Sequence, residues 1–291
     1  MKNIAILGYG NIGQAAEQAL SISTDLTLLR IYHHNEIDSL ESDCREGKID
    51  GVIICTPTRE VQTYAERLLR TGVCTVDSFD IHGQIVSLRQ ALNTEAVSGQ
   101  AVAVVAAGWD PGTDSVVRTL MKAMVPNGLT YTNFGPGRSM GHTVAAKAIK
   151  GVKNALSMTI PLGTGIHRRM VYIELEEGAQ YEDVKQRLLQ DDYFAHDETH
   201  VIAVDSVEAL NNVAHGVELI RNGVSGTTHN QRMTFSMTIN NPALTGQVLV
   251  STLRAALRLQ QEKRYGAYTL IEIPPIYLLE GETEENIKQL V

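Results

Sequence analysis

The sequence predicts an α/β protein in which a Rossmann-type, doubly wound parallel sheet is joined to a second α+β domain of mixed sheet. Three observations favour this fold class. Strand-like and helix-like segments alternate through the N-terminal part of the chain, a glycine-rich turn follows the first strand-like segment, and strand-like segments then succeed one another with few helices between them. Alternation is typical of a parallel sheet covered by helices, whereas successive strands are typical of a mixed sheet.

The first domain is expected over residues 1–113. Residues 2–7 are almost wholly apolar after Asn3, as in a parallel strand that is buried on both faces. A glycine turn, helix formers at 14–21 and a second apolar run at 26–32 follow, so about thirty residues form one βαβ unit. The same alternation predicts strands at 51–55, 73–77 and 101–106 and helices at 61–71 and 85–93.

The second domain is expected over residues 114–240. The patterns predict strands at 129–134, 155–160, 169–175, 200–204 and 233–239, with helices at 114–124 and 181–190. Residues 241–291 are expected to return to the first domain, through a helix at 242–262 and a strand at 268–273.

The composition argues against several classes of protein. Hydrophobic residues make up 43% of the chain and charged residues 20%, which is ordinary for a globular protein. The formal net charge of −8 argues against a nucleic-acid partner, because such proteins usually present a basic face. The apolar runs fall short of the ~20 residues of a membrane span, and the N-terminus lacks signal-peptide features. We therefore expect no membrane partner and a cytoplasmic location.

Metal and disulfide chemistry are not expected. The three cysteines, Cys44, Cys55 and Cys74, are an odd number without metal-type spacing, and two of them lie in or beside apolar runs. Buried reduced thiols are the better interpretation. No His, Cys or carboxylate cluster has metal-ligand spacing, so we predict no metal.

A glycine-rich turn is the candidate cofactor site. It reads Gly8-Tyr9-Gly10-Asn11-Ile12-Gly13, follows a strand and opens a helix, which is the context of dinucleotide binding. Gly8 would allow the tight turn, Gly10 would let the backbone approach the pyrophosphate, and Gly13 would let helix and strand pack closely. The helix N-terminus would offer free N–H groups to the same anion. The alternative is a plain strand-to-helix turn without a ligand.

The end of the second predicted strand favours NADP over NAD. An acidic residue there would bind the ribose 2′-hydroxyl of NAD, but the sequence reads Tyr32-His33-His34-Asn35. His33 and His34 are candidate donors to a 2′-phosphate, and exposed turn histidines without a role are the alternative.

Two further loops are expected at the carboxyl ends of strands, where ligands bind in open α/β sheets. Thr56-Pro57-Thr58 would line the cofactor. The following loop reads Asp77-Ser78-Phe79-Asp80-Ile81-His82. It would bring Asp77, Ser78 and Phe79 to the cofactor. It would also bring two carboxylates and a histidine toward the nicotinamide end.

Four segments together carry a resemblance to a known family. They are the glycine turn at 8–13, Cys74-Thr75-Val76-Asp77-Ser78-Phe79-Asp80-Ile81-His82, Gly108-Trp109-Asp110-Pro111-Gly112 and Phe134-Gly135-Pro136-Gly137-Arg138-Ser139-Met140-Gly141-His142. Through them the chain resembles the meso-diaminopimelate dehydrogenases along most of its length. The resemblance implies NADP-dependent, reversible oxidative deamination of meso-2,6-diaminoheptanedioate at its D-centre, giving L-2-amino-6-oxoheptanedioate and ammonia. It also implies a homodimer and a role in lysine and cell-wall precursor metabolism.

The resemblance further implies which residues bind substrate. Those around the reacting D-centre would be Asp80, Trp109, Asp110, Met140 and Gly141, and those holding the distal L-centre would be Thr159, Arg169, His229 and Asn241. Many relatives carry paired arginines in place of His33-His34 and glutamine in place of Met140. The second difference makes other D-amino acids candidate substrates.

The chemistry of these residue types suits a substrate with two ammonium groups and two carboxylates. Asp80 and Asp110 suit the reacting ammonium and the positive charge that develops as hydride leaves, and we predict them as the catalytic pair. Arg169 is the natural bidentate partner of a carboxylate, with its neighbour Arg168 on the opposite face of the strand.

Each assignment has a structural alternative. Asp80 could cap a helix, Asp110 could begin a turn and Asn241 could be an N-cap. Arg169 could be a surface charge and Trp109 a core residue. His229 lies in a polar loop, which favours ligand contact over a structural role.

Two rival functions remain open from the sequence. One is another NADP-linked reductase of lysine biosynthesis, such as a dihydrodipicolinate reductase-like enzyme, which would not need the Gly108 to Gly112 segment or a distal clamp. The other is a non-catalytic NADP(H)-binding sensor, against which the polar residues expected at the nicotinamide end argue.

Overall fold

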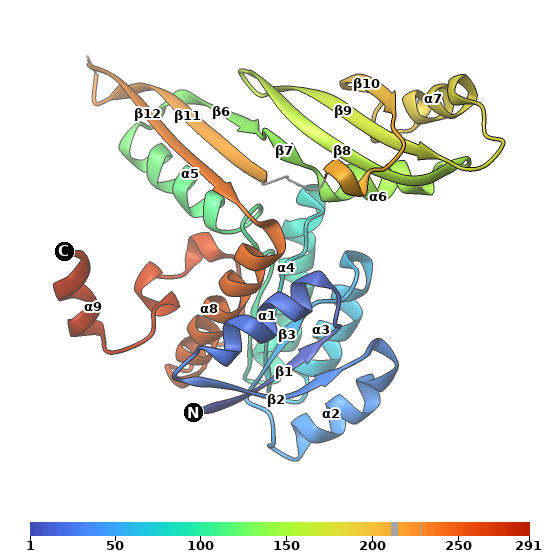
Figure 1. Cartoon of the computed structure of the whole chain (residues 1–291). Coiled ribbons are helices and arrows are strands. Elements are labelled where there is room, and N and C mark those ends of the chain that lie inside the picture. Colours follow the sequence, from blue (N-terminus) through green and yellow to red (C-terminus); the bar gives the residue numbers. More distant parts are fainter. Residues whose placement is uncertain (211–214, 228) are drawn as a thin grey trace. The chain divides into compact units, whose positions relative to one another are not determined.

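The computed structural model describes residues 1–210, 215–227 and 229–291, and for Met140 and His229 it describes the backbone alone. The chain forms two compact units (Figure 1). The first comprises Met1–Thr119 and Asn241–Val291, and the second comprises Leu120–Asn240. Helix α5 (Thr113–Met124) crosses the division, so the units separate at 119/120 rather than at 113/114.

The first unit is built on a six-stranded sheet in the order β13-β5-β4-β3-β1-β2, in which every strand pair is parallel. The strands are β1 (Lys2–Leu7), β2 (Leu26–Tyr32), β3 (Gly51–Ile54), β4 (Cys74–Asp77), β5 (Val102–Val104) and β13 (Gly266–Tyr268). The strand order reverses between β1 and β3, and the crevice outside such a switch point is where open α/β sheets bind ligands.

Helices cover both faces of this sheet. They are α1 (Asn11–Ser21), α2 (Ile37–Arg45), α3 (Val61–Leu69), α4 (Ile85–Ser98) and α8 (Asn241–Gln261), with α9 (Thr283–Leu290) at the C-terminus. Ile4 and Ile6 of β1 pack into one core with α1 and α8, whereas Ala5 and Leu7 belong to the core beneath α2, α3 and α4. Strand β1 is therefore apolar on both faces, as the sequence predicts.

The described part of the second unit contains two sheets, and one of them is the mixed sheet expected. Its strands are β6 (Asn127–Phe134), β7 (Gly137–Arg138), β8 (Val152–Gly163), β9 (Ile166–Leu175), β10 (Glu198–Ala203), β11 (His215–Ser225) and β12 (His229–Ile239). One sheet has the order β10-β9-β8-β7 and is mixed, because β10 runs parallel to β9. The other, β12-β11-β6, is wholly antiparallel.

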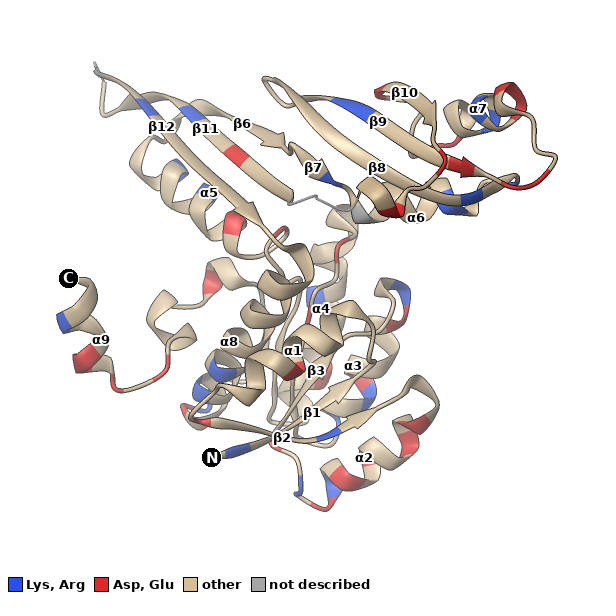
Figure 2. Cartoon of the chain, viewed as in Figure 1, with Lys and Arg blue, Asp and Glu red and all other residues tan. Residues whose placement is uncertain are grey.

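Besides the end of α5, the described part of the second unit contains two helices, although the sequence patterns predict only the later one. Helix α6 (Met140–Ala148) packs with α7 (Tyr181–Gln190) on the core formed by Val171 and Ile173. Helix α7 carries charges of both signs on its outer face, as does α2 in the first unit (Figure 2). Helix α6 is short, and its N-cap residue Ser139 makes no side-chain cap hydrogen bond.

The strand expected at 268–273 is wrong beyond Tyr268. Leu270–Glu272 forms a 3₁₀ turn instead, because the side chains of Thr269 and Glu272 form a capping box. Leu270 and Ile273 are nonetheless buried in the core. The apolar run therefore reflects burial rather than strand pairing.

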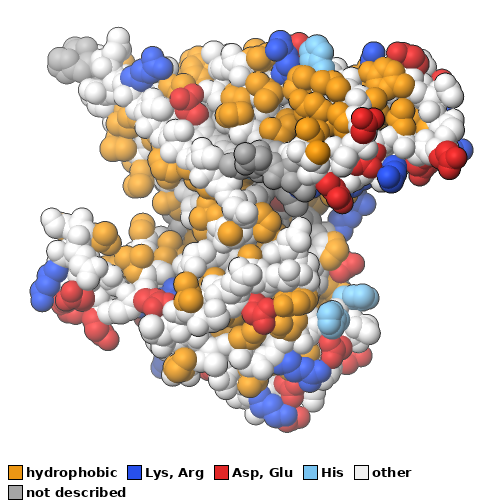
Figure 3. All heavy atoms as spheres, in the orientation of Figure 1, with side chains coloured by type: hydrophobic (Ala, Val, Ile, Leu, Met, Phe, Trp, Pro, Cys, Tyr) orange, Lys and Arg blue, Asp and Glu red, His pale blue; other side chains and the backbone are white. Residues whose placement is uncertain are grey.

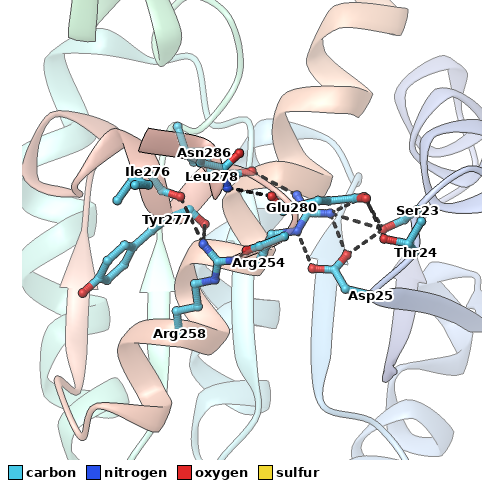
Figure 4. Close-up of polar contacts among 11 residues, drawn as sticks. Ser23, Thr24, Asp25, Arg254, Arg258, Ile276, Tyr277, Leu278, Glu280 and Asn286 are labelled. Atoms are coloured by element: carbon cyan, nitrogen blue, oxygen red, sulfur yellow. Dashed lines mark hydrogen bonds and ion pairs between the residues drawn. The ribbon is translucent and has the colours of Figure 1, made fainter. Parts of the chain in front are cut away.

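Arg254 of α8 anchors the C-terminal segment to the first unit (Figure 4). Its guanidinium, 4% exposed, forms ion pairs with Asp25 at 2.5 Å and Glu280 at 2.8 Å. It also donates to the carbonyl of Leu278. One turn later, Arg258 donates to the carbonyls of Ile276, Tyr277 and Gly281. The backbone beyond α8 is thus held by side chains of this helix.

Candidate active site

The glycine turn has the close approaches that a dinucleotide site requires. Gly8 has φ +96°, and a Cβ there would lie 2.6 Å from the carbonyl oxygen of Cys55. A Cβ at Gly13 would lie 2.3 Å from the carbonyl oxygen of Gly8. At Gly10, by contrast, a Cβ would meet no heavy atom of the described residues within 4 Å. The first and third glycines are therefore required by packing, and the second borders open space.

The N-terminus of α1 adds a second feature for anion binding. The helix begins after Gly10, which has no side-chain cap, and the first helical hydrogen bond runs from Gln14 N–H to the Gly10 carbonyl at 3.0 Å. The N–H groups of the first helical turn have no carbonyl partner within the helix and point toward the space above Gly10. These features fit a dinucleotide pyrophosphate.

The loop after β3 lies against this turn, as the switch-point topology requires. Cys55 N–H donates to the carbonyl of Leu7 at 2.7 Å. The buried hydroxyl of Thr56 has no hydrogen-bond partner among the described residues, so it has capacity to bind a cofactor. Thr58 donates to Asp80 Oδ1 at 2.7 Å. The predicted cofactor loop and the predicted catalytic carboxylate are thus neighbours.

Gly10→Ala is expected to weaken cofactor binding without loosening the fold. The added methyl group has room in the protein alone but would occupy the space that the pyrophosphate enters, so we expect NADPH affinity to fall by on the order of tenfold in fluorescence titration. Gly13→Ala is the matched control, because its Cβ collides with backbone and should lower the melting temperature instead. Wild-type NADPH affinity in Gly10→Ala would contradict this assignment.

The loop after β2 contains a carboxylate, Glu36, that is not among the residues predicted from sequence. Glu36 folds back so that its Oε2 accepts from the backbone N–H of His33 at 2.8 Å. Arg30 holds the other oxygen at 2.7 Å, and the His33 hydrogen bond and Arg30 together lower the pKa of Glu36. His33 and His34 are exposed. Residues 32–35 contain no acidic residue, but the loop does contain one, Glu36.

The side chains of Asp77 and Phe79 have structural roles, and the assignment of both residues as cofactor contacts stays a prediction. The Asp77 carboxylate accepts from the N–H groups of Phe79 at 2.9 Å and Ala106 at 3.1 Å, and burial raises its pKa to about 6. The Phe79 ring is buried in the core. Asp77 therefore joins the loops that follow β4 and β5, while Ser78 is half-buried and Asp80 is exposed beyond it.

Asp110 belongs to a cluster of two carboxylates and one guanidinium. Arg118 Nη2 lies 2.7 Å from Asp114 Oδ2, whereas the two terminal nitrogens of Arg118 lie 3.4 and 3.5 Å from Asp110 Oδ1. Burial and Asp110 raise the pKa of Asp114 to about 8. Trp109, which precedes the cluster, is 5% exposed. Asp114 and Arg118 are not among the residues predicted from sequence, although their i, i+4 spacing on a helix was a signal.

The start of α8 lies beside these loops in the first unit. Asn241 is the first residue of α8, and its Oδ1 accepts from Thr245 at 3.2 Å. A Cβ at Gly108 would lie 3.6 Å from Thr245 and 3.5 Å from Ser78. The first unit therefore brings the loops that carry Asp80, Trp109 and Asp110 close to the start of α8, where Asn241 lies.

Thr159 and Arg169, both predicted for the distal end of the substrate, lie opposite each other on β8 and β9. Arg169 donates to the Thr159 hydroxyl through Nη1 and to Asp197 through Nε at 2.6 Å. Its side chain is 13% exposed, whereas Arg168 is 39% exposed and pairs with Glu198. Arg168 is therefore a surface charge, whereas Arg169 is not.

His142 completes the polar group around Arg169. Its Nδ1 lies 2.8 Å from the Ser139 hydroxyl, and its ring packs edge-on against Tyr193 and Phe194. Burial and the charge of Arg169 lower the pKa of His142 to about 4, so the ring is neutral at neutral pH. Asp197 was missed because it lies on a loop and nothing in the local sequence marks it.

The remaining predicted contacts are placed only in part. Met140 and Gly141 begin α6, and Gly141 is exposed; the side chain of Met140 lies outside the described residues. The side chain of His229 also lies outside them, and its backbone pairs with Ser225 at the start of β12.

Two features are absent from the residues that the structure describes: a membrane-spanning helix and a cluster of metal ligands. Within the described ranges, every helix is too short or too polar to cross a membrane. Likewise, the described His, Cys, Asp and Glu side chains form no group of three or more that could hold a metal ion.

Comparisons with known proteins agree with this geometry. The family model of the diaminopimelic acid dehydrogenase C-terminal domain matches residues 108–168. A meso-diaminopimelate D-dehydrogenase of Bacteroides fragilis is 51% identical, over 99% of this chain and 98% of its own. One from Acetivibrio thermocellus is 31% identical, over 99% and 97%. The Corynebacterium glutamicum DAP dehydrogenase, solved in complex with DAP, is 26% identical with a TM-score of 0.89, over 100% and 99%.

A doubly wound sheet with a GxGxxG turn at its switch point defines a dinucleotide-binding oxidoreductase of the Rossmann class. On the full-length similarity, the chain belongs to the meso-diaminopimelate D-dehydrogenase family and is an oxidoreductase acting on CH–NH₂ donors. This family assignment replaces the two alternatives left open by the sequence, a dihydrodipicolinate reductase-like enzyme and a non-catalytic NADP(H)-binding sensor.

Proposed function

We propose that this chain catalyses the reversible, NADP-dependent oxidative deamination of meso-2,6-diaminoheptanedioate at its D-centre. The products are L-2-amino-6-oxoheptanedioate and ammonia, and the reaction would serve lysine and cell-wall precursor metabolism. The observation that carries the proposal is the full-length 51% identity to a meso-diaminopimelate D-dehydrogenase. The hydrogen-bonded Thr159–Arg169–Asp197 group supports it, because this arrangement suits a carboxylate remote from the reacting centre.

At the reacting end, Asp80 and Asp110 bind the substrate ammonium. Their negative charges orient the amino group and favour the positive charge that develops on the substrate as hydride leaves. NADP supplies the hydride acceptor when bound. Asp80 receives a hydrogen bond from Thr58, so the same loop that lines the cofactor also positions this carboxylate.

At the distal end, Arg169 binds the L-centre carboxylate. Asp197 and Thr159 occupy Nε and Nη1 and so fix the plane of the guanidinium. A group that is already oriented loses less rotamer entropy when substrate arrives. Asn241 and His229 are proposed to add polar contacts there, and Trp109, Met140 and Gly141 are proposed around the D-centre.

The preference for NADP is supported by the loop after β2. Arg30 neutralises Glu36, and Arg30, His33 and His34 are all available as donors near the 2′-position. An engineered D-amino acid dehydrogenase, 25% identical with a TM-score of 0.85, was solved bound to NADP⁺. That likeness, together with methionine at position 140, also makes other D-amino acids candidate substrates.

A homodimer through the second unit is the proposed assembly. Figure 3 shows hydrophobic side chains gathered over its four-stranded sheet, and the exposed ones include Leu162, Ile166 and Ile202. Such exposed apolar surface is typical of an interaction site. Sedimentation equilibrium would measure the mass. The cytoplasmic location stays a prediction that cell fractionation would check.

The decisive test is a spectrophotometric assay of NADPH formation. Purified protein would be given meso-diaminopimelate, its LL- and DD-isomers, and a panel of D- and L-amino acids, each with NADP and with NAD. We expect the highest kcat/KM with the meso isomer and NADP. Folded protein without NADPH formation from the meso isomer would refute the reaction, and equal kcat/KM with NAD would refute the cofactor preference.

A further inference from the structure

We propose that Asp197 binds the distal ammonium of meso-diaminopimelate, so that Arg169 and Asp197 together recognise the zwitterionic L-amino acid end of the substrate. This inference rests on the proposed function, because it concerns the end of the substrate that is assigned to Arg169. It adds a specificity-determining residue to the distal contacts.

The ion pair between Arg169 and Asp197 leaves hydrogen-bonding capacity on both partners. Asp197 accepts from Arg169 Nε through Oδ2 at 2.6 Å, and among the described residues its Oδ1 accepts no hydrogen bond. Arg169 donates through Nη1 to the Thr159 hydroxyl, and within the same residues its Nη2 has no acceptor. A carboxylate can accept at both oxygens, and a guanidinium can donate from all three nitrogens. One ion pair therefore offers both an open acceptor and an open donor.

The neighbouring ion pair on the same two strands is closed by comparison. Strands β9 and β10 run parallel, with Arg168 opposite Glu198. Arg168 donates to both oxygens of Glu198, at 2.8 and 3.1 Å, and His200 lies 2.8 Å from the same carboxylate. Glu198 thus receives three contacts, whereas Asp197, one residue earlier, receives one. The difference marks Asp197 as the carboxylate with room for a ligand.

The turn that carries Asp197 is held independently of Arg169. Phe194 is 1% exposed and packs in the core of the second unit. Its N–H donates to the carbonyl of Asp191 at 2.9 Å. The Thr199 hydroxyl donates to the carbonyls of Phe194 and Asp197, each at 3.2 Å. The backbone of Asp197 is therefore fixed before a ligand arrives, which lowers the entropic cost of binding.

The charges of this group fit a zwitterion better than a lone anion. The side chain of Arg169 is 13% exposed and that of Asp197 28%, so both are partly withdrawn from water. Burial and the charge of Arg169 lower the pKa of His142 and of His167, so both rings are neutral at neutral pH. Arg169 and Asp197 contribute one charge of each sign, as does the L-centre. A distal carboxylate without an ammonium would place a second negative charge near Asp197, which disfavours such a ligand.

D-2-Aminoheptanedioate isolates the contribution of the distal ammonium. It has the carbon chain, the D-centre and the distal carboxylate of meso-diaminopimelate, but hydrogen replaces the distal amino group. Wild type should prefer meso-diaminopimelate by on the order of tenfold or more in kcat/KM, the size of one charge-assisted hydrogen bond. A site that leaves a polar group unpaired rejects the analogue that lacks its partner.

The experiment measures kcat and KM for wild type, Asp197→Asn and Glu198→Gln with both substrates at saturating NADP. The asparagine keeps an oxygen that can accept from Arg169 but carries no charge. Asp197→Asn should therefore raise KM for meso-diaminopimelate by on the order of tenfold, lower kcat less, and leave KM for D-2-aminoheptanedioate unchanged or reduced. Glu198→Gln is the matched control, because it alters the adjacent surface pair, and it should behave as wild type.

Two results would overturn the inference. If Asp197 only oriented Arg169, both substrates would lose equally in Asp197→Asn, because both carry the distal carboxylate. A preference for meso-diaminopimelate that is as large in Asp197→Asn as in wild type would also reject the role of Asp197. If Asp197→Asn folds poorly by circular dichroism, Asp197→Ser serves instead, since a hydroxyl also accepts a hydrogen bond without charge.

Calorimetric titration in the presence of NADPH, which cannot accept a hydride, separates this inference from the proposed function. Wild type should bind meso-diaminopimelate with a Kd on the order of tenfold lower than that of D-2-aminoheptanedioate, and Asp197→Asn should bind the two equally. If wild type fails to oxidise meso-diaminopimelate, the proposed reaction fails while this comparison still tests Asp197. Wild type that binds the two compounds equally, or binds neither, rejects the role of Asp197.

Discussion

Arg169→Ala is expected to lower kcat/KM for meso-diaminopimelate by about 2–5 kcal/mol, tens- to thousands-fold, because the distal carboxylate would be desolvated without its partner. The loss should be larger than for an exposed arginine, since Arg169 is 13% exposed and is already oriented by Asp197 and Thr159. Steady-state kinetics with NADP held saturating measures it. NADPH affinity should stay unchanged, because Arg169 is assigned to substrate and not to cofactor.

Arg168→Ala is the matched control for that variant. Arg168 is the next residue on the same strand, but it pairs with Glu198 at the surface and is 39% exposed. D-Alanine is the second control because it has no distal carboxylate, so any turnover of it should fall much less. A parallel collapse on both substrates would give Arg169 a structural role, and an unchanged kcat/KM would remove it from the site.

Arg254→Met is expected to lower the free energy of unfolding by about 2–4 kcal/mol. The variant keeps the buried aliphatic stem but leaves Asp25 and Glu280 without their cation. Both carboxylates are more than a third exposed and can regain water, so the low end of the range for a broken buried pair is expected. Urea unfolding followed by circular dichroism measures the loss.

The control for Arg254 is Arg264→Ala. Arg264 pairs with Glu262 at 3.5 Å at the surface, and such pairs contribute about 0–1 kcal/mol. Limited proteolysis should also cut the segment after α8 faster in Arg254→Met than in Arg264→Ala. Equal unfolding free energies for the two variants would show that the Arg254 network does not anchor the C-terminal segment.

The same network has a pH signature. Burial alone would raise the pKa of Asp25, but hydrogen bonds from Arg254 and Ser23 outweigh it and lower the pKa below the usual aspartate range. A carboxylate with a lowered folded pKa stabilises the fold above its unfolded pKa, and the stabilisation is lost as pH falls through the folded value. The stability difference between wild type and Arg254→Met should therefore shrink on acidification below about pH 4.

The fold class and cofactor turn were accessible from sequence because their signals are local. A parallel strand buried on both faces must be apolar throughout, and only glycine fits where a Cβ would strike backbone, as at Gly8 and Gly13. The cross-strand pair Thr159–Arg169 was accessible only through resemblance. Its strands were expected, but their register depends on the hairpin that joins them.

Other features depended on the tertiary structure, since they join residues that are distant in sequence or that local pattern cannot orient. Asp197 reaches Arg169 across a loop, and Asp25 meets Arg254 from the far end of the chain. Asp77 was expected to contact the cofactor, but its carboxylate accepts hydrogen bonds from two backbone N–H groups, one of them after β5. Sequence determined which segments are buried and where a dinucleotide could approach. Only the tertiary structure decided which charged groups pair with each other. Long-range packing sets the distances and the burial of each carboxylate, and these decide whether it stabilises the fold or stays available as an anion.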